Sequence, residues 1–306
     1  LQGYFPYHTV HGTGVEEVRY SDGNRRIHEL RTPKGTLREV STHIPEAYTD
    51  APTEHLIKGP EDLAVLRYVY EQVSFEPDYA FAEKRRPWVE EAGIILCYGP
   101  KTPLMQLVAL DAGIETVVGC FAEDATGFQD TLELMENRLD EALDLALKSP
   151  ADCLMIPENL SSEVVGRMFY DGFAAPCHGR WTERIRQSGK PSFIHMDGTL
   201  RGLIREVAAS GVDVLEALTP QPVGDMAMSA MREMTGPGPV LWGGLPGVYF
   251  TPLVDDAAFE KHVIAMLEYM RWDRHCVLGV ADQVPPDGLR ERVARVAELA
   301  EQYGVY

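Results

Sequence analysis

Short runs of apolar residues alternate with amphipathic stretches from about residue 90 to the end of the chain. The apolar runs are GIILCY, DCLMIP, SFIHMD, VDVLEAL, PVLWGG and CVLGVAD, and helix-like stretches such as FQDTLELMENRLDEALDLAL and DDAAFEKHVIAMLEYM lie between them. Continuous apolar strands that alternate with helices are typical of parallel strands buried on both faces. Because the connections are short and six or more strands follow one another, the pattern favours a (β/α)8 TIM barrel over a doubly wound sheet.

The first forty residues have a different pattern. The runs VEEVRY, RRIHELRT and TLREVST are separated by SDGN and PKG, which supply the turn chemistry of antiparallel hairpins. We expect three antiparallel strands, followed by a linker (IPEAYTDAPTEHL) and a helix that begins at GPED. The chain is therefore interpreted as a single domain over 1–306, with an antiparallel β segment and linker at 1–58 and the barrel at 59–306.

The charge balance limits the classes of partner. With 28 Lys and Arg against 47 Asp and Glu, the net charge is −19, and such a surface repels nucleic acid and anionic membranes. No apolar stretch reaches the roughly 18 residues needed to span a bilayer, and no charged-then-apolar leader is visible. The five cysteines are widely spaced and include no CxxC pair, which is typical of reduced thiols. We therefore expect a cytoplasmic protein.

Polar or glycine residues follow most of the apolar runs. In a parallel barrel, active residues stand at the carboxyl ends of the strands, so these positions form the candidate site. In chain order they are Tyr98, Gly99, Glu158, Asn159, His195, Asp197, Glu216, Gly243, Gly244 and Asp282.

His195 and Asp197 are the strongest candidates for a pair of catalytic or metal-binding residues. At a spacing of two on a strand, their side chains point to the same side, and Glu216 follows on the adjacent strand. One imidazole with carboxylates from neighbouring strands suits a catalytic metal site with an open position, or a general acid–base pair that acts on an organic substrate. A structural interpretation also stands, in which His195 ends a strand and Asp197 is the N-cap of the helix in DGTLRGLIREV.

Other features are weaker candidates. The glycines of GPGPVLWGGLPG suggest a dinucleotide loop, but Gly236 and Gly238 precede the strand instead of following it. His178, in PCHGRW, is interpreted as a surface histidine. The methionines between 226 and 234 are expected to pack a helix.

With these residues in place, the chain resembles the uroporphyrinogen decarboxylase superfamily, which includes that decarboxylase and the methylcobamide:coenzyme M methyltransferases. The resemblance runs from TPKGTLRE and IKGPEDL through YGPKTPLMQL to the strand ends and VLGVADQVPPD. It implies a TIM barrel. The corrinoid-dependent methyltransferases and cobalamin-independent methionine synthase share this barrel and the arrangement of a zinc site, so the resemblance also implies a zinc site of that kind.

The resemblance assigns metal ligands residue by residue. The zinc-dependent methyltransferases have His-x-Cys-Gly, which here reads His-Met-Asp-Gly from His195, and a Cys at the last strand end, which falls on Asp282. Glu216 lies where the methionine synthases place a glutamate near the metal. Aspartate therefore replaces both cysteines, and carboxylates make a harder, less selective site than thiolates. The resemblance still allows Zn2+ bound by His195, Asp197, Glu216 and Asp282, but it does not guarantee a metal.

The decarboxylase branch fits less well. Its last strand ends in Gly-His-Gly, where this chain has Gly-Val-Ala at 279–281, and its arginine-rich amino-terminal motif has no counterpart in LQGYFPYHTVHGTG. A site for an octa-acidic porphyrin also needs a basic lining, and these strand ends are acidic or neutral.

We therefore expect an enzyme that transfers a methyl group between a small methylated donor and a corrinoid protein or a related acceptor. His195, Asp197 and Glu216 are the expected catalytic residues. The expected substrate-binding residues are Tyr98, Glu158, Asn159, Gly243 and Gly244. Two alternatives stay open: a metal-free decarboxylase or lyase in which the acidic cluster transfers a proton to a carbanion, and a non-catalytic barrel that binds a small ligand. Barrels of this kind often dimerise, so a homodimer is also left open.

Overall fold

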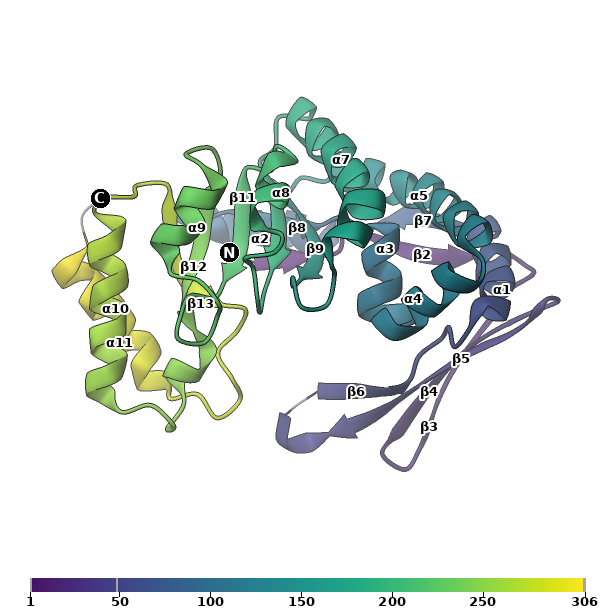
Figure 1. Ribbon diagram of the computed structural model, residues 1–306, viewed down its shortest axis with the longest axis horizontal. Helices are drawn as coiled ribbons and strands as arrows, with labels where there is room; N and C mark the ends of the chain where they lie inside the picture. Colours follow the sequence, from purple (N-terminus) through teal and green to yellow (C-terminus); the bar gives the residue numbers. More distant parts are fainter. Residues whose placement is uncertain (1, 48, 305–306) are drawn as a thin grey trace. The chain divides into compact units, whose positions relative to one another are not determined.

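The computed structural model describes residues 2–47 and 49–304 (Figure 1). Its contacts divide the chain into two compact units. The first unit comprises Leu1–Glu158 and Asp171–Lys190, and the second comprises Asn159–Tyr170 and Pro191–Tyr306. The single domain expected over 1–306 stays a prediction.

An antiparallel sheet occupies the amino-terminal part of the first unit. In the order in which they pair, its strands are β3 (Glu16–Asp22), β4 (Arg25–Thr32), β5 (Gly35–Ile44) and β6 (Thr49–Glu54). The three antiparallel strands expected from the sequence are confirmed, and Gly23, with a φ of 60°, forms the first tight turn. The prediction of a linker after these strands is wrong in part, because a 3-10 turn (Pro45–Ala47) and β6 lie within that stretch. The reason is that β5 pairs with β6 along the edge that does not pair with β4.

A second antiparallel pair in the first unit joins β2 (Tyr7–His11) to β7 (Val73–Pro77). Helix α1 (Pro60–Glu71) precedes β7 and has Pro at its start, where the missing N–H is not needed. It buries Leu63, Leu66 and Val69, whose spacing is that of one helix face. The sequence pattern predicts the start of this helix but not the β2–β7 pair.

Three parallel strands form the rest of the first unit, together with the helices that cover them. In pairing order the strands are β1 (Gln2–Tyr4), β8 (Ile95–Tyr98) and β9 (Cys153–Leu160). The helices are α2 (Ala80–Val89), α3 (Pro103–Gln106), α4 (Ile114–Glu123), α5 (Ala125–Lys148) and α7 (Ala175–Gln187). A π-helical turn (Leu107–Asp111) follows α3, and a second (Tyr170–Ala174) precedes α7.

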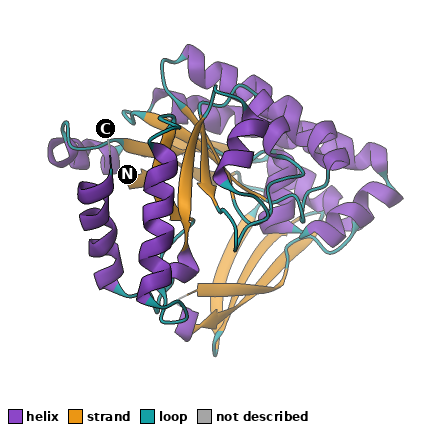
Figure 2. Cartoon of the chain, turned by 60° about the vertical axis from the view of Figure 1, so that its left-hand side comes forward, coloured by secondary structure: helices purple, strands orange, loops and turns teal. Residues whose placement is uncertain are grey.

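The second unit contains four parallel strands and their helices. In pairing order the strands are β10 (Ser192–Met196), β11 (Val214–Leu218), β12 (Val240–Pro246) and β13 (Cys276–Ala281). The helices are α6 (Arg167–Phe169), α8 (Ile204–Ala209), α9 (Met228–Thr235), α10 (Asp256–Met270) and α11 (Arg290–Tyr303), with a 3-10 turn (Gly247–Phe250) after β12. Helices α10 and α11 lie side by side (Figures 1 and 2), and their apolar faces bury Phe259, Val263 and Leu299 in one cluster.

The alternation of strands and helices expected from the sequence is confirmed. Each of the six apolar runs forms a parallel strand, and β1 brings the number of parallel strands in the described residues to seven. The chain is thus an α/β protein with TIM-like alternation, and the closed eight-stranded barrel stays a prediction. None of the described helices combines the length and the apolar character that a membrane span requires. All five cysteines are free thiols, and four of them are buried.

Candidate functional site

His195 and Glu216 are in direct contact in the second unit. The parallel register of β10 and β11 places the two residues opposite each other. The imidazole Nδ1 and the carboxylate Oε2 are 2.6 Å apart, and each side chain is only 13% exposed. The hydrogen bond fixes the orientation of the ring, so that Nε2 is the nitrogen left to act on a ligand.

Two further carboxylates act on the imidazole of His195. Asp282 Oδ1 lies 4.0 Å from Nε2, and the negative charge of Asp197 also acts on the ring. Burial lowers the pKa of His195, whereas the hydrogen bond and charge of Glu216 and the charges of the two aspartates raise it, and the net shift is upward. This environment favours the protonated imidazole, whose Nε2 carries an N–H that is able to donate to a ligand.

Left-handed backbone conformations mark three of the strand ends. The residues other than glycine with positive φ at these ends are Asn159 (56°), Ala217 (67°) and Asp282 (68°). In β11 this conformation coincides with a bulge, because the register with β12 shifts between Leu215 and Leu218. Such backbone costs about 1–3 kcal/mol per residue and clusters at functional sites, and bulges redirect side chains next to active sites. The bulge thus sets the direction of Glu216.

The donor atoms around His195 do not form a metal centre. Within residues 2–47 and 49–304, no group of three or more His, Cys, Asp or Glu side chains is arranged to hold a metal ion. Glu216 is bonded to Nδ1, so the remaining donors are His195 Nε2 and the carboxylates of Asp197 and Asp282, and these are not gathered into such a group. The described residues thus show no assembled zinc centre, and the zinc assignment stays a prediction.

Asp197 lies in the turn that follows β10. Helix α8 begins at Ile204, with Leu203 at its N-cap, so the interpretation of Asp197 as the N-cap of this helix is wrong. The residues between them form turns instead, because Asp225 accepts hydrogen bonds from the backbone N–H groups of Leu200 and Arg201. The helix therefore gives no structural reason for a carboxylate at 197.

Gly243 and Gly244 have separate structural roles in β12. A Cβ at Gly243 would lie 2.3 Å from the carbonyl oxygen of Leu218 in β11, so this glycine allows two strand backbones to approach closely. Gly244 has open space by comparison, with its nearest neighbours at 3.7 Å, and its carbonyl accepts a hydrogen bond from His262 Nε2 at 2.8 Å. Close strand packing thus accounts for Gly243, and a substrate contact at either glycine stays a prediction.

Glu158, at the end of β9, is fully buried. Its oxygens accept hydrogen bonds from the backbone N–H and the hydroxyl of Thr102 at 2.6 and 2.8 Å, and His178 Nε2 lies 3.5 Å away. Burial raises the pKa of Glu158, but the opposite effect of these partners is larger, so the pKa lies below its ordinary value. The interpretation of His178 as a surface residue is wrong, because helix α7 places it in the interior opposite this carboxylate.

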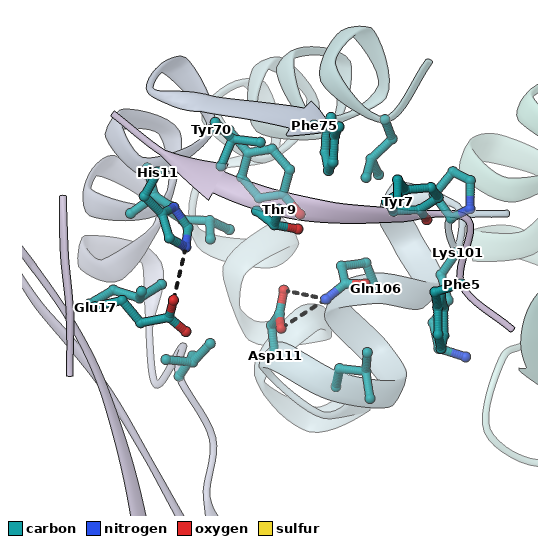
Figure 3. Close-up of a pocket in the computed structure, with 18 of the residues that line it drawn as sticks. Phe5, Tyr7, Thr9, His11, Glu17, Tyr70, Phe75, Lys101, Gln106 and Asp111 are labelled. Atoms are coloured by element: carbon teal, nitrogen blue, oxygen red, sulfur yellow. Dashed lines mark hydrogen bonds and ion pairs between the residues drawn. The ribbon is translucent and has the colours of Figure 1, made fainter. Parts of the chain in front are cut away.

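The first unit also contains a cavity of about 760 Å³ that the sequence reasoning missed. Figure 3 shows Tyr7, Thr9 and His11 on the strand β2 at one side and Gln106 and Asp111 on the helical segment across from it. One signal was available, since those three β2 residues alternate with period two and therefore share a face. Tyr98, predicted from its strand end, packs against this region, with its ring 5.1 Å from the ring of Phe5.

Comparisons with known proteins are consistent with this architecture. Residues 89–303, more than half of the chain, match the family model described as Uroporphyrinogen decarboxylase (URO-D). Among solved structures, a methyltransferase from Methanosarcina mazei is similar, with 12% sequence identity and a TM-score of 0.58 over 83% of this chain and 72% of that chain. At this identity the likeness concerns the fold alone. No curated protein sequence matches the chain.

Proposed function

Because the chain belongs to the uroporphyrinogen decarboxylase family, we propose that it is an enzyme that transfers a methyl group between a small methylated donor and a corrinoid protein or a related acceptor. The observation that carries the proposal is the contact of His195 with Glu216 across two neighbouring parallel strands, with His195 one residue before the carboxyl end of β10. This is the position at which barrel enzymes place catalytic groups.

The chemistry assigned to His195 is proton donation to the leaving atom. In methyl transfer, the electron pair of the acceptor forms the new bond to carbon, and the electron pair of the broken bond stays on the donor heteroatom. A protonated imidazole beside that atom transfers its Nε2 proton to it and so neutralises the charge that develops. Glu216 orients the ring and stabilises its positive charge.

The charges around the ring favour a donor without carboxylates. Asp282 lies 4.0 Å from Nε2, and the charges of Glu216 and Asp197 act on the same ring. A polyanionic substrate would add further negative charge to this cluster, whereas a neutral ether, alcohol or thioether would not. Substrate contacts at Tyr98, Glu158, Asn159, Gly243 and Gly244, a corrinoid protein partner and a homodimer are parts of the same proposal.

The test supplies free cob(I)alamin as the acceptor and a panel of small O-, N- and S-methylated compounds as donors, and it follows the cobalamin spectrum. Wild-type protein should form methylcobalamin with at least one donor. His195→Ala should reduce the rate by about 10²–10⁴-fold, the range for loss of a general acid. His8→Ala, which removes an exposed imidazole in the first unit, serves as the control. Full turnover by His195→Ala would refute the assignment.

A metal-free decarboxylase or lyase is the second candidate, because the same Nε2–H can protonate a carbanion. The family match and the proton donor favour it, whereas the three carboxylates near the ring disfavour a carboxylate substrate. Release of CO2 from a carboxylated substrate without any change in the cobalamin spectrum would favour this reaction over methyl transfer.

A further inference from the structure

The cavity in the first unit has mostly apolar walls. Its aromatic lining residues include Phe5, Tyr7, Tyr70 and Phe75, and Tyr7 packs edge-to-face on Phe75 with ring centroids 5.6 Å apart. The volume of about 760 Å³ lies within the roughly 300–1,000 Å³ typical of pockets that hold small molecules. Aromatic side chains with this geometry favour a planar, apolar partner.

Phe5 is unusually exposed for an aromatic residue that lines a cavity. It is 59% exposed, and its ring lies between those of Tyr7 and Tyr98, at centroid distances of 6.5 and 5.1 Å. Large exposed apolar groups that rim a concave surface mark binding sites. A ligand in the cavity would cover this ring and gain the free energy of burying it.

Asp111 is one of the polar residues that line this mostly apolar cavity. Asp111 lies at the end of the π-helical turn (Leu107–Asp111), a rare conformation that recurs at functional sites. Gln106 Nε2 donates to both of its oxygens, at 3.0 and 3.2 Å (Figure 3). Burial raises the pKa of Asp111 to about 7, so at pH 6 the group is mostly a neutral acid with one O–H to donate.

Several of the charged residues that line the cavity are paired with one another, and Lys101 Nζ donates to the carbonyl oxygen of Pro157. Glu17 accepts from Arg19 at 2.7 Å and lies 3.0 Å from His28 Nε2, and His11 Nε2 is 3.9 Å from the same carboxylate. These contacts satisfy the charge of Glu17 within the cavity itself. An ionic ligand would lose hydration among the aromatic walls, whereas a neutral ligand would lose little.

We propose that this cavity is a binding site for an uncharged aromatic molecule that carries an oxygen acceptor. The ring would lie among Phe5, Tyr7 and Phe75, and the oxygen would accept a hydrogen bond from Asp111. The site goes beyond methyl transfer and does not depend on it, because binding is an equilibrium property of the cavity itself.

The experiment measures binding by calorimetry at pH 6 with three probes of the same ring size. The first, 2-acetylnaphthalene, carries a carbonyl acceptor; 2-ethylnaphthalene has a similar shape without oxygen, and 2-naphthoate is anionic. The ketone should bind about tenfold more tightly than either of the other two, the difference expected for one satisfied hydrogen bond in an apolar site.

Variants locate the bound ketone. Phe5→Ala should weaken binding about tenfold with little effect on folding, because the ring is already exposed. Asp111→Leu should weaken it similarly, and Asp111→Asn, whose amide N–H also donates, should stay within about threefold of wild type. Trp272→Ala removes a 90% exposed ring in the second unit and should change nothing.

Three results would overturn the proposal. The first is the absence of ketone binding to the wild-type protein. The second is equal affinity for all three probes, which would mean that Asp111 does not select an oxygen acceptor. The third is an affinity for the ketone that stays at the wild-type value in both Phe5→Ala and Asp111→Leu, which would place the bound ring elsewhere.

Discussion

His195 and Glu216 occupy partner positions in the register of β10 and β11, and their side chains meet at 2.6 Å. Both residues belong to strands and not to loops, so the sheet itself sets the distance between them. Contacts held by regular elements are more sharply positioned than contacts held by loops. The position of the pair is therefore set by the strands and not by a loop.

Replacement of Glu216 by Gln should lower the pKa of His195. The variant keeps the shape of the side chain but removes the charge that, with the hydrogen bond, raises this pKa against the effect of burial. NMR titration of the imidazole, with the protein prepared in chelator, measures the shift directly. Asp282→Asn should cause a smaller decrease, because Asp282 is 55% exposed and lies 4.0 Å from the ring. An unchanged pKa in Glu216→Gln would show that the two side chains do not pair in solution.

Local patterns were sufficient for the strands and helices of the second half of the chain. An apolar run such as SFIHMD predicts a buried strand from its own residues. Helix α10 likewise has a local start signal, because its N-cap Asp255 accepts a hydrogen bond from Ala258 N–H at 2.8 Å. The strand β6 could not be predicted in this way. It is a mostly exposed edge strand that pairs with the second edge of β5, and pairing between strands leaves little mark on a local sequence.

The candidate site was predictable where chemistry and strand ends coincide. His195 and Glu216 were found because parallel strands bring their carboxyl ends together. Asp111 was missed because it lies in a π-helical turn with no strand before it, and its raised pKa depends on burial that only the folded chain creates. His178 was misread for a similar reason, because its polar sequence neighbours hide its place in the interior.

Gly243→Ala should destabilise the protein by more than the same change at a glycine with open surroundings. A Cβ at 243 would lie 2.3 Å from the carbonyl oxygen of Leu218, which is backbone and cannot rotate away. Overpacking of this kind costs about 1–3 kcal/mol, in addition to the strain of a φ of 150°. Gly236→Ala is the matched control, since its φ is 70° and nothing lies within 4 Å of the added atom. Chemical denaturation of both variants measures the difference, and equal losses would contradict the packing argument.

The ion pair of Asp273 should stabilise the protein above pH 4 and cease to do so in acid. Arg232 Nε and the Tyr269 hydroxyl each donate to Asp273 at 2.7 Å; burial raises the pKa of this group, but these bonds lower it to about 2. A carboxyl with a lowered folded-state pKa contributes fully above its unfolded pKa, and the contribution disappears as the pH falls from about 4 to about 2.

Asp273→Asn should therefore lose about 2 kcal/mol of this pH-dependent stability at neutral pH, since one pKa unit corresponds to about 1.4 kcal/mol. Urea denaturation between pH 7 and pH 2.5 should show the wild type and the variant converging toward acid. Asp287→Asn, at an exposed position of the second unit, provides the control. A constant difference across this range would mean that the charge of Asp273 makes no contribution.

Asp111→Asn should stabilise the protein at alkaline pH. Burial raises the folded-state pKa of Asp111 to about 7, so ionisation is harder in the folded chain than in the unfolded one. The wild type therefore loses stability as the pH rises from about 4 to about 7, and the lost amount stays constant above that range. The amide cannot ionise and still accepts from Gln106 through its oxygen, so the variant should be more stable by about 2–4 kcal/mol at pH 8 and similar to wild type near pH 4. Thermal unfolding across this range, with Asp130→Asn on the exposed face of α5 as the control, measures the effect. A variant that is less stable than wild type at pH 8 would show that Asp111 is ionised and satisfied in the folded chain.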